Sequence, residues 1–181
     1  LQFIVGTRLF FSSEPLLSLA AYPLHREGYR NLCSLLTQGK RRTKKGGCEL
    51  TLEDLYSYAE GMSYIILPPP YSPTYATTYA TYIATLQQRL TSPLYFALSR
   101  TFTHDSHHRW EWVCHLAETL KIPLIATSDP LYHTASRKPL TDVLHCIRHH
   151  CTVQSAGFKL TQNSERVLKY PQEMHRLFRT R

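Results

Sequence analysis

Residues 64–127 decide the fold class, because short apolar runs alternate there with longer segments of helical periodicity. The segments read, in chain order, YIIL at 64–67, YATTYATYIATLQQR at 75–89, LYFAL at 94–98, SHHRWEWVCHLAETL at 106–120 and PLIAT at 123–127. Short apolar runs are typical of buried strands, and the longer segments each carry apolar residues at helical spacing. A repeated strand–helix–strand order predicts an α/β fold with parallel strands.

The residues before this unit predict a hairpin and two helices. The expected elements are a strand at 2–9, its hairpin partner at 16–20, a helix at 28–38 that ends at Gly39, and a helix that begins after Thr51. Thr51 is a favoured N-cap, and Asp54 lies three residues further on, at the position that completes a capping box.

The residues after this unit predict a loop at 128–139, a helix at 140–149 and a last helix near 172–178. The whole chain then contains about four or five strands. A closed α/β barrel takes about 250 residues and about eight strand–helix units. The 181 residues therefore supply either part of a barrel or a small open sheet.

The composition fits a globular domain and no membrane span. Apolar residues make up 43% of the chain, and no apolar run reaches the roughly 18 residues that a span needs. The five cysteines include no C-x-x-C pair, which argues against a disulfide framework and a zinc ribbon. We expect reduced thiols, mostly in the core, in a cytoplasmic protein.

The net charge of +8 has two interpretations, contact with nucleic acid or solubility alone. The densest basic run is a glycine-ended loop that contains Lys40, Arg41, Arg42, Lys44 and Lys45. These residues fit a patch that contacts phosphates. A solvated loop explains the same residues, and the sequence alone favours it.

Four tyrosines recur at helical spacing: Tyr71, Tyr75, Tyr79 and Tyr82. One interpretation is base stacking on these rings. The favoured interpretation is an amphipathic helix that packs this face on the sheet, from about Tyr75 to Arg89.

Polar side chains come directly after two of the predicted strands, where α/β folds gather their reactive groups. His104 comes after the strand at 94–98, and Asp129 after the strand at 123–127. A carboxylate and an imidazole suit a divalent metal that activates water against a phosphoester. The alternatives are structural, because Asp105 or Ser106 can cap the next helix and Asp129 can form a turn. Two candidate ligands fall short of the three or four that a metal site needs.

Motifs of several enzyme classes are absent. The sequence has no G-x-x-x-x-G-K-[ST], G-x-G-x-x-G, G-x-S-x-G or H-E-x-x-H. Binding of a nucleotide cofactor and serine-hydrolase chemistry therefore have no support.

Several segments resemble the PHP (polymerase and histidinol phosphatase) domains of bacterial DNA polymerases of the polymerase III alpha-subunit type. GYRNLCSLLT at 28–37 resembles that family's G-Y-x-N-L-C-x-L-[IL]-T, and PLIATSD at 123–129 resembles its P-[LV]-[VI]-A-T-N-D. GGCEL at 46–50 and LEDL at 52–55 fit the family's sequence directly after the first of these segments. Further segments resemble the error-prone branch: LYH at 131–133, RKPL at 137–140, DVL at 142–144, CIR at 146–148, AG at 156–157, NSER at 163–166, LK at 168–169 and PQEM at 171–174.

The resemblance covers essentially the whole chain and implies an α/β, PHP-type (β/α) barrel of seven strands. Residues 1–181 would form a single partial PHP domain, roughly the C-terminal two-thirds of that barrel and N-terminally truncated. The implied parent is a translesion polymerase whose reaction is DNA-templated DNA synthesis. Its palm-domain carboxylates would lie C-terminal to this region, and DNA and the remaining polymerase domains are the implied partners.

Three departures from the family's metal-binding pattern are visible. The H-x-H motif of the first strand would precede residue 1. The family's G-A-E-L corresponds to GTRL at 6–9, so that Arg8 replaces a ligand Glu, and a guanidinium has no lone pair for a cation. The family's D-x-H corresponds to Asp129-Pro130-Leu131, so that Leu131 stands at the position of the ligand His. His133 lies two residues after Leu131, and in an extended chain its side chain points the same way as that of Leu131. We expect at most weak zinc or manganese binding at Asp129, His104 and His133.

Three functions are therefore open. The first is a non-catalytic, structural part of a DNA polymerase. The second is a metal-dependent phosphoesterase or proofreading nuclease of the PHP superfamily, built on His104, Asp129 and His133. The third is a free-standing nucleic-acid-binding module, supported by net charge, the basic loop and the tyrosines.

Overall fold

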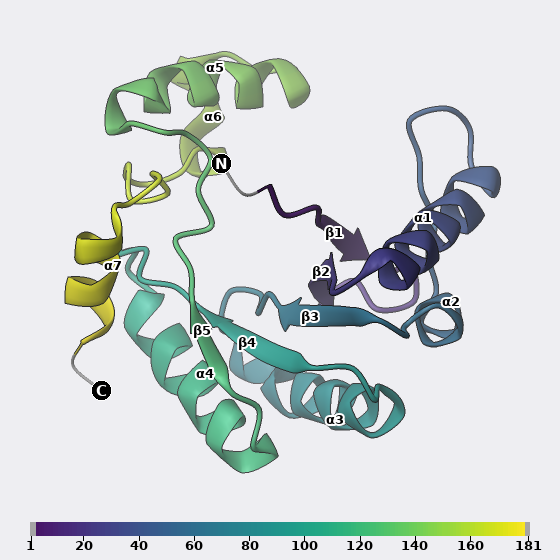
Figure 1. The fold of residues 1–181 in the computed structure, drawn as a ribbon. Coiled ribbons are helices and arrows are strands. Elements are labelled where there is room, and N and C mark those ends of the chain that lie inside the picture. The colour runs from purple at the N-terminus through teal and green to yellow at the C-terminus, as the bar shows by residue number, and fades with distance from the viewer. Residues whose placement is uncertain (1–2, 180–181) are drawn as a thin grey trace. The chain divides into compact units, whose positions relative to one another are not determined.

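The computed structural model describes residues 3–179 and is a mixed α/β fold (Figure 1). Its strands are β1 (Thr7–Phe10), β2 (Ser18–Pro23), β3 (Met62–Ile66), β4 (Leu94–Leu98) and β5 (Leu124–Ala126). Its α-helices are α1 (Arg26–Arg41), α2 (Leu52–Ser57), α3 (Pro73–Arg89), α4 (Ser106–Leu120), α5 (Lys138–Arg148), α6 (Val153–Ala156) and α7 (Pro171–Phe178). Two short 3-10 helices occupy Ala135–Arg137 and Gly157–Lys159.

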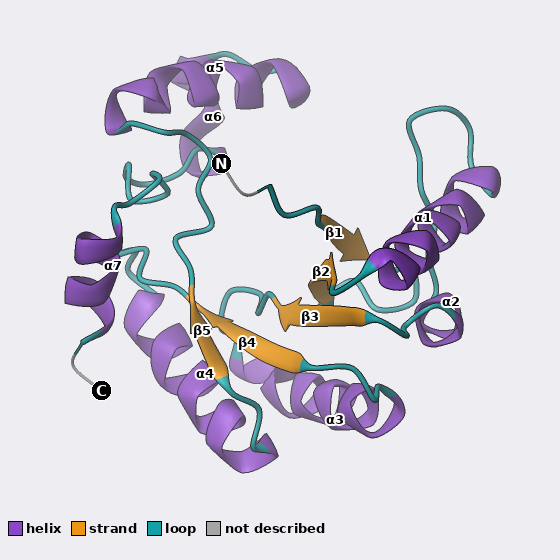
Figure 2. Ribbon diagram, viewed as in Figure 1, coloured by secondary structure: helices purple, strands orange, loops and turns teal. Residues whose placement is uncertain are grey.

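The five strands form one open sheet in the order β1-β2-β3-β4-β5 (Figure 2). β1 and β2 are the predicted antiparallel hairpin, and β3 and β4 are parallel and joined through α3, as the strand–helix–strand pattern predicts. β2 and β3 are antiparallel, with Leu19 opposite Ile66. The fold is compatible with part of a barrel, and the PHP barrel itself remains a prediction.

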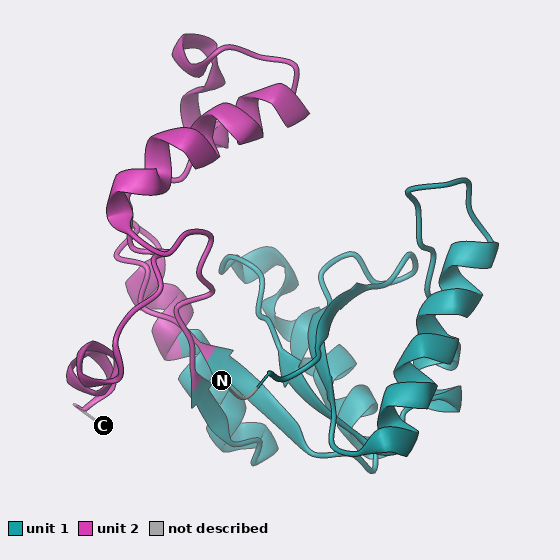
Figure 3. Cartoon of the chain, turned by 45° about the horizontal axis from the view of Figure 1, so that its top comes forward, with its two compact units in different colours: residues 1–97, 112–125 teal, residues 98–111, 126–181 magenta. Residues whose placement is uncertain are grey.

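The chain divides into two compact units (Figure 3). Unit 1 contains residues 1–97 and 112–125, and unit 2 contains residues 98–111 and 126–181. β4, α4 and β5 contribute residues to both units. Whether residues 1–181 form a single PHP domain stays a prediction.

The core of unit 1 is built from alternate residues of the strands and one face of each covering helix. In β3, Met62, Tyr64 and Ile66 are fully buried while the residues between them are partly exposed, which is the period of a strand. α3 buries Tyr79, Ile83 and Leu86 at helical spacing.

Three of the four tyrosines of the predicted pattern pack around one tryptophan of unit 1. The ring centroids of Tyr71, Tyr75 and Tyr79 lie 5.6, 6.5 and 5.2 Å from that of Trp112. Such tilted and edge-on aromatic pairs are favourable. Tyr79 is fully buried, so the interpretation as a packed helix face is confirmed at this residue.

The predicted cap of α2 is confirmed. Thr51 Oγ1 accepts a hydrogen bond from the Asp54 backbone N–H at 3.2 Å, and the Asp54 carboxylate accepts one from the Thr51 N–H at 2.9 Å. Two backbone donors at the start of the helix are thereby satisfied.

The cysteines are all free within the structure, as expected, but they are not mostly core residues. Cys114 and Cys146 are buried, whereas Cys33 and Cys48 are exposed. Both exposed residues lie on or near α1, which turns only one face toward the sheet. Among the described residues, no helix is both long and apolar enough to cross a membrane.

Candidate functional site

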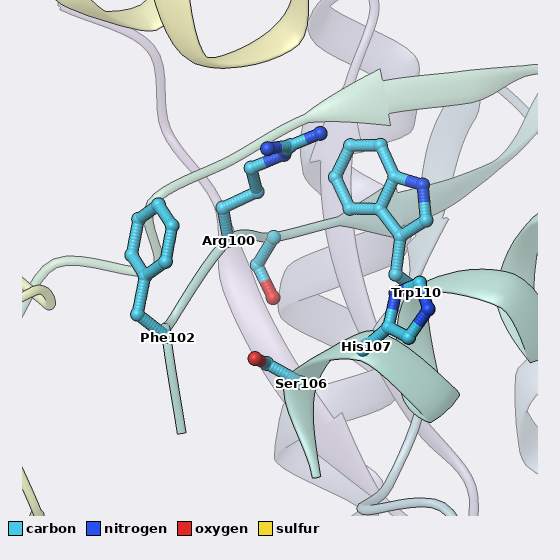
Figure 4. Close-up of a pocket in the computed structure, with 6 residues that line it drawn as sticks. Arg100, Phe102, Ser106, His107 and Trp110 are labelled. Carbon is cyan, nitrogen blue, oxygen red and sulfur yellow. The ribbon is translucent and has the colours of Figure 1, made fainter. Parts of the chain in front are cut away.

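The loop between β4 and the start of α4 forms a pocket in unit 2. The cavity has a volume of about 270 Å³ and is lined by Ser99, Arg100, Phe102, Ser106, His107 and Trp110. Figure 4 shows the Arg100 side chain extending to the indole of Trp110, with Phe102 on its other side and with Ser106 and His107 coming from α4. The pocket thus combines one permanent cation with hydroxyl, imidazole and aromatic groups.

Arg100 is held in this pocket by aromatic contact. Its guanidinium carbon lies 4.4 Å from the centroid of the Trp110 ring, a cation–π distance. Trp110 in turn stacks on Phe178 of α7, with the ring centroids 5.6 Å apart. The Arg100 Nε atom is buried and has no hydrogen-bond partner among residues 3–179.

Phe102 lies beside Arg100 in a strained backbone conformation. Its φ is 50°, in the left-handed region that bulky side chains rarely adopt. The loop is fixed there from outside, because Asn163 Nδ2 donates to the carbonyl oxygens of Thr101 at 2.7 Å and Phe102 at 3.2 Å. Residues held in this way cluster at binding sites.

The predicted metal ligand Asp129 is paired with an arginine of the same unit. Arg166 donates from Nη2 to the Asp129 carboxylate at 2.6 Å and from Nε to the Asp129 carbonyl at 3.0 Å. Asp129 has a φ of 41°, a conformation that Asp tolerates better than most residues. Its carboxylate would have to exchange this guanidinium for a metal ion.

The two histidines predicted as ligands are both exposed. His104 Nδ1 lies 3.4 Å from Gln162 Nε2 and 4.0 Å from the Asp105 carboxylate. His133 lies in the segment before the first 3-10 helix. Across residues 3–179, no group of three or more His, Cys, Asp or Glu side chains is arranged to hold a metal ion.

Arg8, at the position where the family resemblance implies a ligand Glu, lies on β1 in unit 1. Its Nη2 donates to Ser18 Oγ at 3.2 Å, and its guanidinium lies 5.0 Å from the Phe10 ring centroid. The arginine is therefore engaged with the hairpin formed by β1 and β2.

The basic loop at the end of α1 does not present five equivalent charges. Arg42 pairs with Asp54, and its Nη2 donates to Oδ1 at 2.7 Å. The Arg42 guanidinium holds the pKa of the Asp54 carboxyl well below its usual range, and bonds from Thr51 add to this effect. Lys40, Arg41, Lys44 and Lys45 are exposed.

The sequence interpretation missed two features of unit 2, the Arg100–Trp110 contact and the Asp129–Arg166 pair. Arg100 lies two residues after a predicted strand, so its place at the sheet's edge was deducible from the same pattern that indicated His104. Arg166 lies 37 residues after Asp129, and no local pattern links them.

The chain is similar to curated proteins along almost its whole length. Error-prone DNA polymerase 1 of Agrobacterium fabrum is 34% identical over 177 residues, which are 98% of this chain and 16% of that protein. The error-prone DNA polymerases of Caulobacter vibrioides and Bradyrhizobium diazoefficiens are 37% and 38% identical, each over 98% of this chain and 16% of their own length. No protein-family model matches the chain.

Proposed function

This chain is homologous to a segment of error-prone DNA polymerases that makes up 16% of their length, and on that premise we propose that it is the PHP-domain segment of a translesion polymerase. Its role in the parent protein is structural. The parent reaction is DNA-templated DNA synthesis in the cytoplasm, on DNA and with the remaining polymerase domains as partners.

The ion pair between Arg166 and Asp129 is the observation that carries the structural role. A divalent metal needs three or four ligands, and the best candidate carboxylate already accepts a charge-assisted hydrogen bond at 2.6 Å. A positive guanidinium beside the carboxylate also opposes the approach of a second cation. We therefore propose that the segment has no intact metal site.

Exposed apolar side chains of unit 2 support a role in packing against other polymerase domains. Leu144 and Ile147 of α5 are 59% and 65% exposed, and Phe158 is fully exposed. The relatives are much longer than the matched segment, since it covers 16% of them. The remaining domains of the parent polymerase are the partner that we propose for this apolar surface.

The basic loop gives a second proposed contact, with the DNA of the parent enzyme. Because Arg42 is neutralised by Asp54, we propose that Lys40, Arg41, Lys44 and Lys45 provide the phosphate contacts. Each such contact would contribute to a salt-dependent, sequence-independent affinity.

Two activity assays test the proposed function. We expect the purified chain to add no nucleotides to a primed template and to hydrolyse no phosphoester when zinc or manganese is supplied. Template-dependent synthesis by the chain alone would overturn the structural role. Metal-dependent hydrolysis that Asp129→Ala abolishes would establish the alternative, a PHP-type phosphoesterase or nuclease.

A further inference from the structure

We propose that the pocket between β4 and α4 binds a phosphate group of single-stranded DNA, with the Arg100 guanidinium as its cationic ligand. The choice of DNA as the source of the phosphate rests on the proposed function. The phosphate chemistry itself rests on the residues of the pocket.

Arg100 has no counter-ion among the residues that the structure describes. No hydrogen bond or ion pair between described residues involves its guanidinium, and its Nε is buried. Three other partly buried cations of unit 2 each bond a carboxylate: Lys138 to Asp142 at 2.6 Å, Arg166 to Asp129 at 2.6 Å, and Lys169 to Glu165 at 2.9 Å. A buried N–H donor without a hydrogen-bond partner is costly, and in Arg100 this donor belongs to a charged group. The simplest compensation for Arg100 is an anionic ligand.

Asp105 and Glu111, the acids close in sequence to the pocket residues, already have polar partners. The Asp105 carboxylate accepts a hydrogen bond from Thr103 Oγ1 at 2.7 Å, and the Glu111 carboxylate lies 3.3 Å from His107 Nε2. The residues that line the cavity include no acid. An anion in the pocket would therefore meet the positive charge of Arg100 and no negative side chain of the lining.

The remaining polar groups of the lining also suit an anion. The Ser99 hydroxyl can donate a hydrogen bond, whereas the Ser106 hydroxyl already donates to the Thr103 carbonyl at 2.6 Å. α4 begins at Ser106 and has no acidic residue in its first turn. The acid at the positive end of its dipole is Asp105, which directly precedes the helix and whose carboxylate already accepts a hydrogen bond from Thr103 Oγ1.

The aromatic residues fix the geometry of the site and limit its ligand. Trp110 contacts both the Arg100 guanidinium and the Phe178 ring, and these contacts restrict where the guanidinium can lie. A cavity of about 270 Å³ lies below the usual range of drug-sized ligand sites. It accommodates a phosphate and part of its sugar. The exposed ring of Phe102 provides a surface for the adjoining base.

The test compares two short single-stranded oligonucleotides of the same sequence, one with a 5′-phosphate and one with a 5′-hydroxyl. Fluorescence anisotropy with the full chain should give tighter binding of the phosphorylated strand, and inorganic phosphate should compete with it. Arg100→Met should remove the difference between the strands, which corresponds to a loss of about ten-fold or more for the phosphorylated one. Arg100→Lys keeps the charge but loses the planar guanidinium, so its preference for the phosphorylated strand should lie between that of the wild type and that of Arg100→Met.

Arg148→Met is the matched control, because it removes an exposed arginine from α5 of the same unit. It should leave the preference for the phosphorylated strand intact. Chemical unfolding separates binding from folding: Arg100→Met should be as stable as the wild type, since it removes an unpaired charge.

Two outcomes would overturn the proposal: equal binding of both strands by the wild type, or an unchanged preference in Arg100→Met. Competition by inorganic phosphate without any preference between the strands would show an anion site that does not serve DNA. None of these results would contradict the structural role proposed for the chain, because that role is tested by the polymerase and hydrolase assays.

Discussion

Asp129 has a partner in the structure that its sequence position does not reveal. The sequence places a carboxylate directly after a strand, where metal ligands gather, and the structure adds a guanidinium from a residue 37 positions later. A carboxylate with a charge-assisted partner serves to hold two segments of unit 2 together. Its availability to a metal therefore depends on Arg166.

Gly28 is a second residue whose role depends on a distant neighbour. A Cβ built on Gly28 would overlap the backbone carbonyl of Gly61, which is a rigid obstacle. Gly61 itself has a φ of 74°, a conformation that suits glycine. α1 can approach this turn closely only because neither residue has a side chain.

We predict that Gly28→Ala destabilises the chain by at least about 2 kcal/mol, because the backbone overlap outweighs the higher helix propensity of alanine. Urea unfolding measures the difference. Cys33→Ala, on an exposed position of the same helix, is the control and should change stability by less than about 0.5 kcal/mol. A Gly28→Ala variant as stable as the control would show that α1 does not pack tightly against Gly61.

The helix α2 is connected to the end of α1 through Asp54. This carboxylate completes the cap of α2 and also binds Arg42, which directly succeeds α1. The cap was predictable from Thr51 and Asp54, because a capping box is a local pattern. The ion pair was not, since it depends on how two helices meet.

We predict a pH-dependent effect of Asp54→Asn. The pKa of Asp54 is lowered in the folded chain, first by Arg42 and then by Thr51, so its charge stabilises the fold at pH values above the ordinary pKa of Asp, about 3.9. The variant should therefore lose about 1 kcal/mol or more near neutral pH. The loss should stay constant down to about pH 5 and shrink below it, as the unfolded wild type takes up a proton.

Urea unfolding of wild type and Asp54→Asn across this pH range provides the measurement. Glu49→Gln, an exposed acid of the preceding loop, controls for the loss of one negative charge. A stability difference that is the same at pH 3 as at pH 7 would contradict the assigned role of the Asp54 charge.

The positions of most elements were predictable, and the exceptions have physical causes. The strand at 94–98 and the helix at 106–120 were predicted with the bounds that they have in the structure. α5 begins at Lys138, two residues early, because Pro139 is tolerated in the first turn of a helix. α6 has only four residues and was missed, although Thr152 and Ser155 form its capping box. The predicted first strand began at Gln2, which lies outside the described residues, and β1 spans Thr7–Phe10.

Within residues 3–179, the sheet ends in two strands with one neighbour each, β1 and β5. Phe10 of β1 and Ile125 of β5 are exposed. Open edges with apolar side chains are sites of strand addition and aggregation. Chain length alone left a partial barrel and a small open sheet as alternatives, and the resemblance implied the partial barrel; the open five-stranded sheet is compatible with it.

We predict that the purified chain self-associates through the β5 edge as its concentration rises. Ile125→Lys should shift sedimentation-velocity profiles toward the monomer, because a charge on an edge strand opposes pairing. Thr119→Lys, which adds the same charge to an exposed position of α4, should leave association unchanged. A chain that stays monomeric at every concentration and unfolds in one sharp transition would rule out self-association through the edge strand β5.

The candidate metal site shows most clearly what sequence alone can and cannot supply. The sequence indicated Asp129 and His104 because both come after predicted strands, and it indicated His133 through the resemblance to the family's D-x-H pattern. It did not reveal Arg166 or the Gln162 contact of His104, since both partners come from a segment that carries no strand or metal pattern. The residue types that can bind a metal are visible in the local sequence, whereas the arginine that pairs with Asp129 is brought to it by the tertiary fold.

Calorimetric titration with zinc tests most directly the proposal that this chain has no intact metal site. We predict weak heats without saturation for the wild type, for Asp129→Ala and for Arg166→Ala, because freeing the carboxylate still leaves too few ligands. The three proteins should therefore be indistinguishable. Saturable, micromolar binding by the wild type that Asp129→Ala abolishes would contradict the claim, since it would mean that zinc displaces Arg166 and recruits further ligands around Asp129.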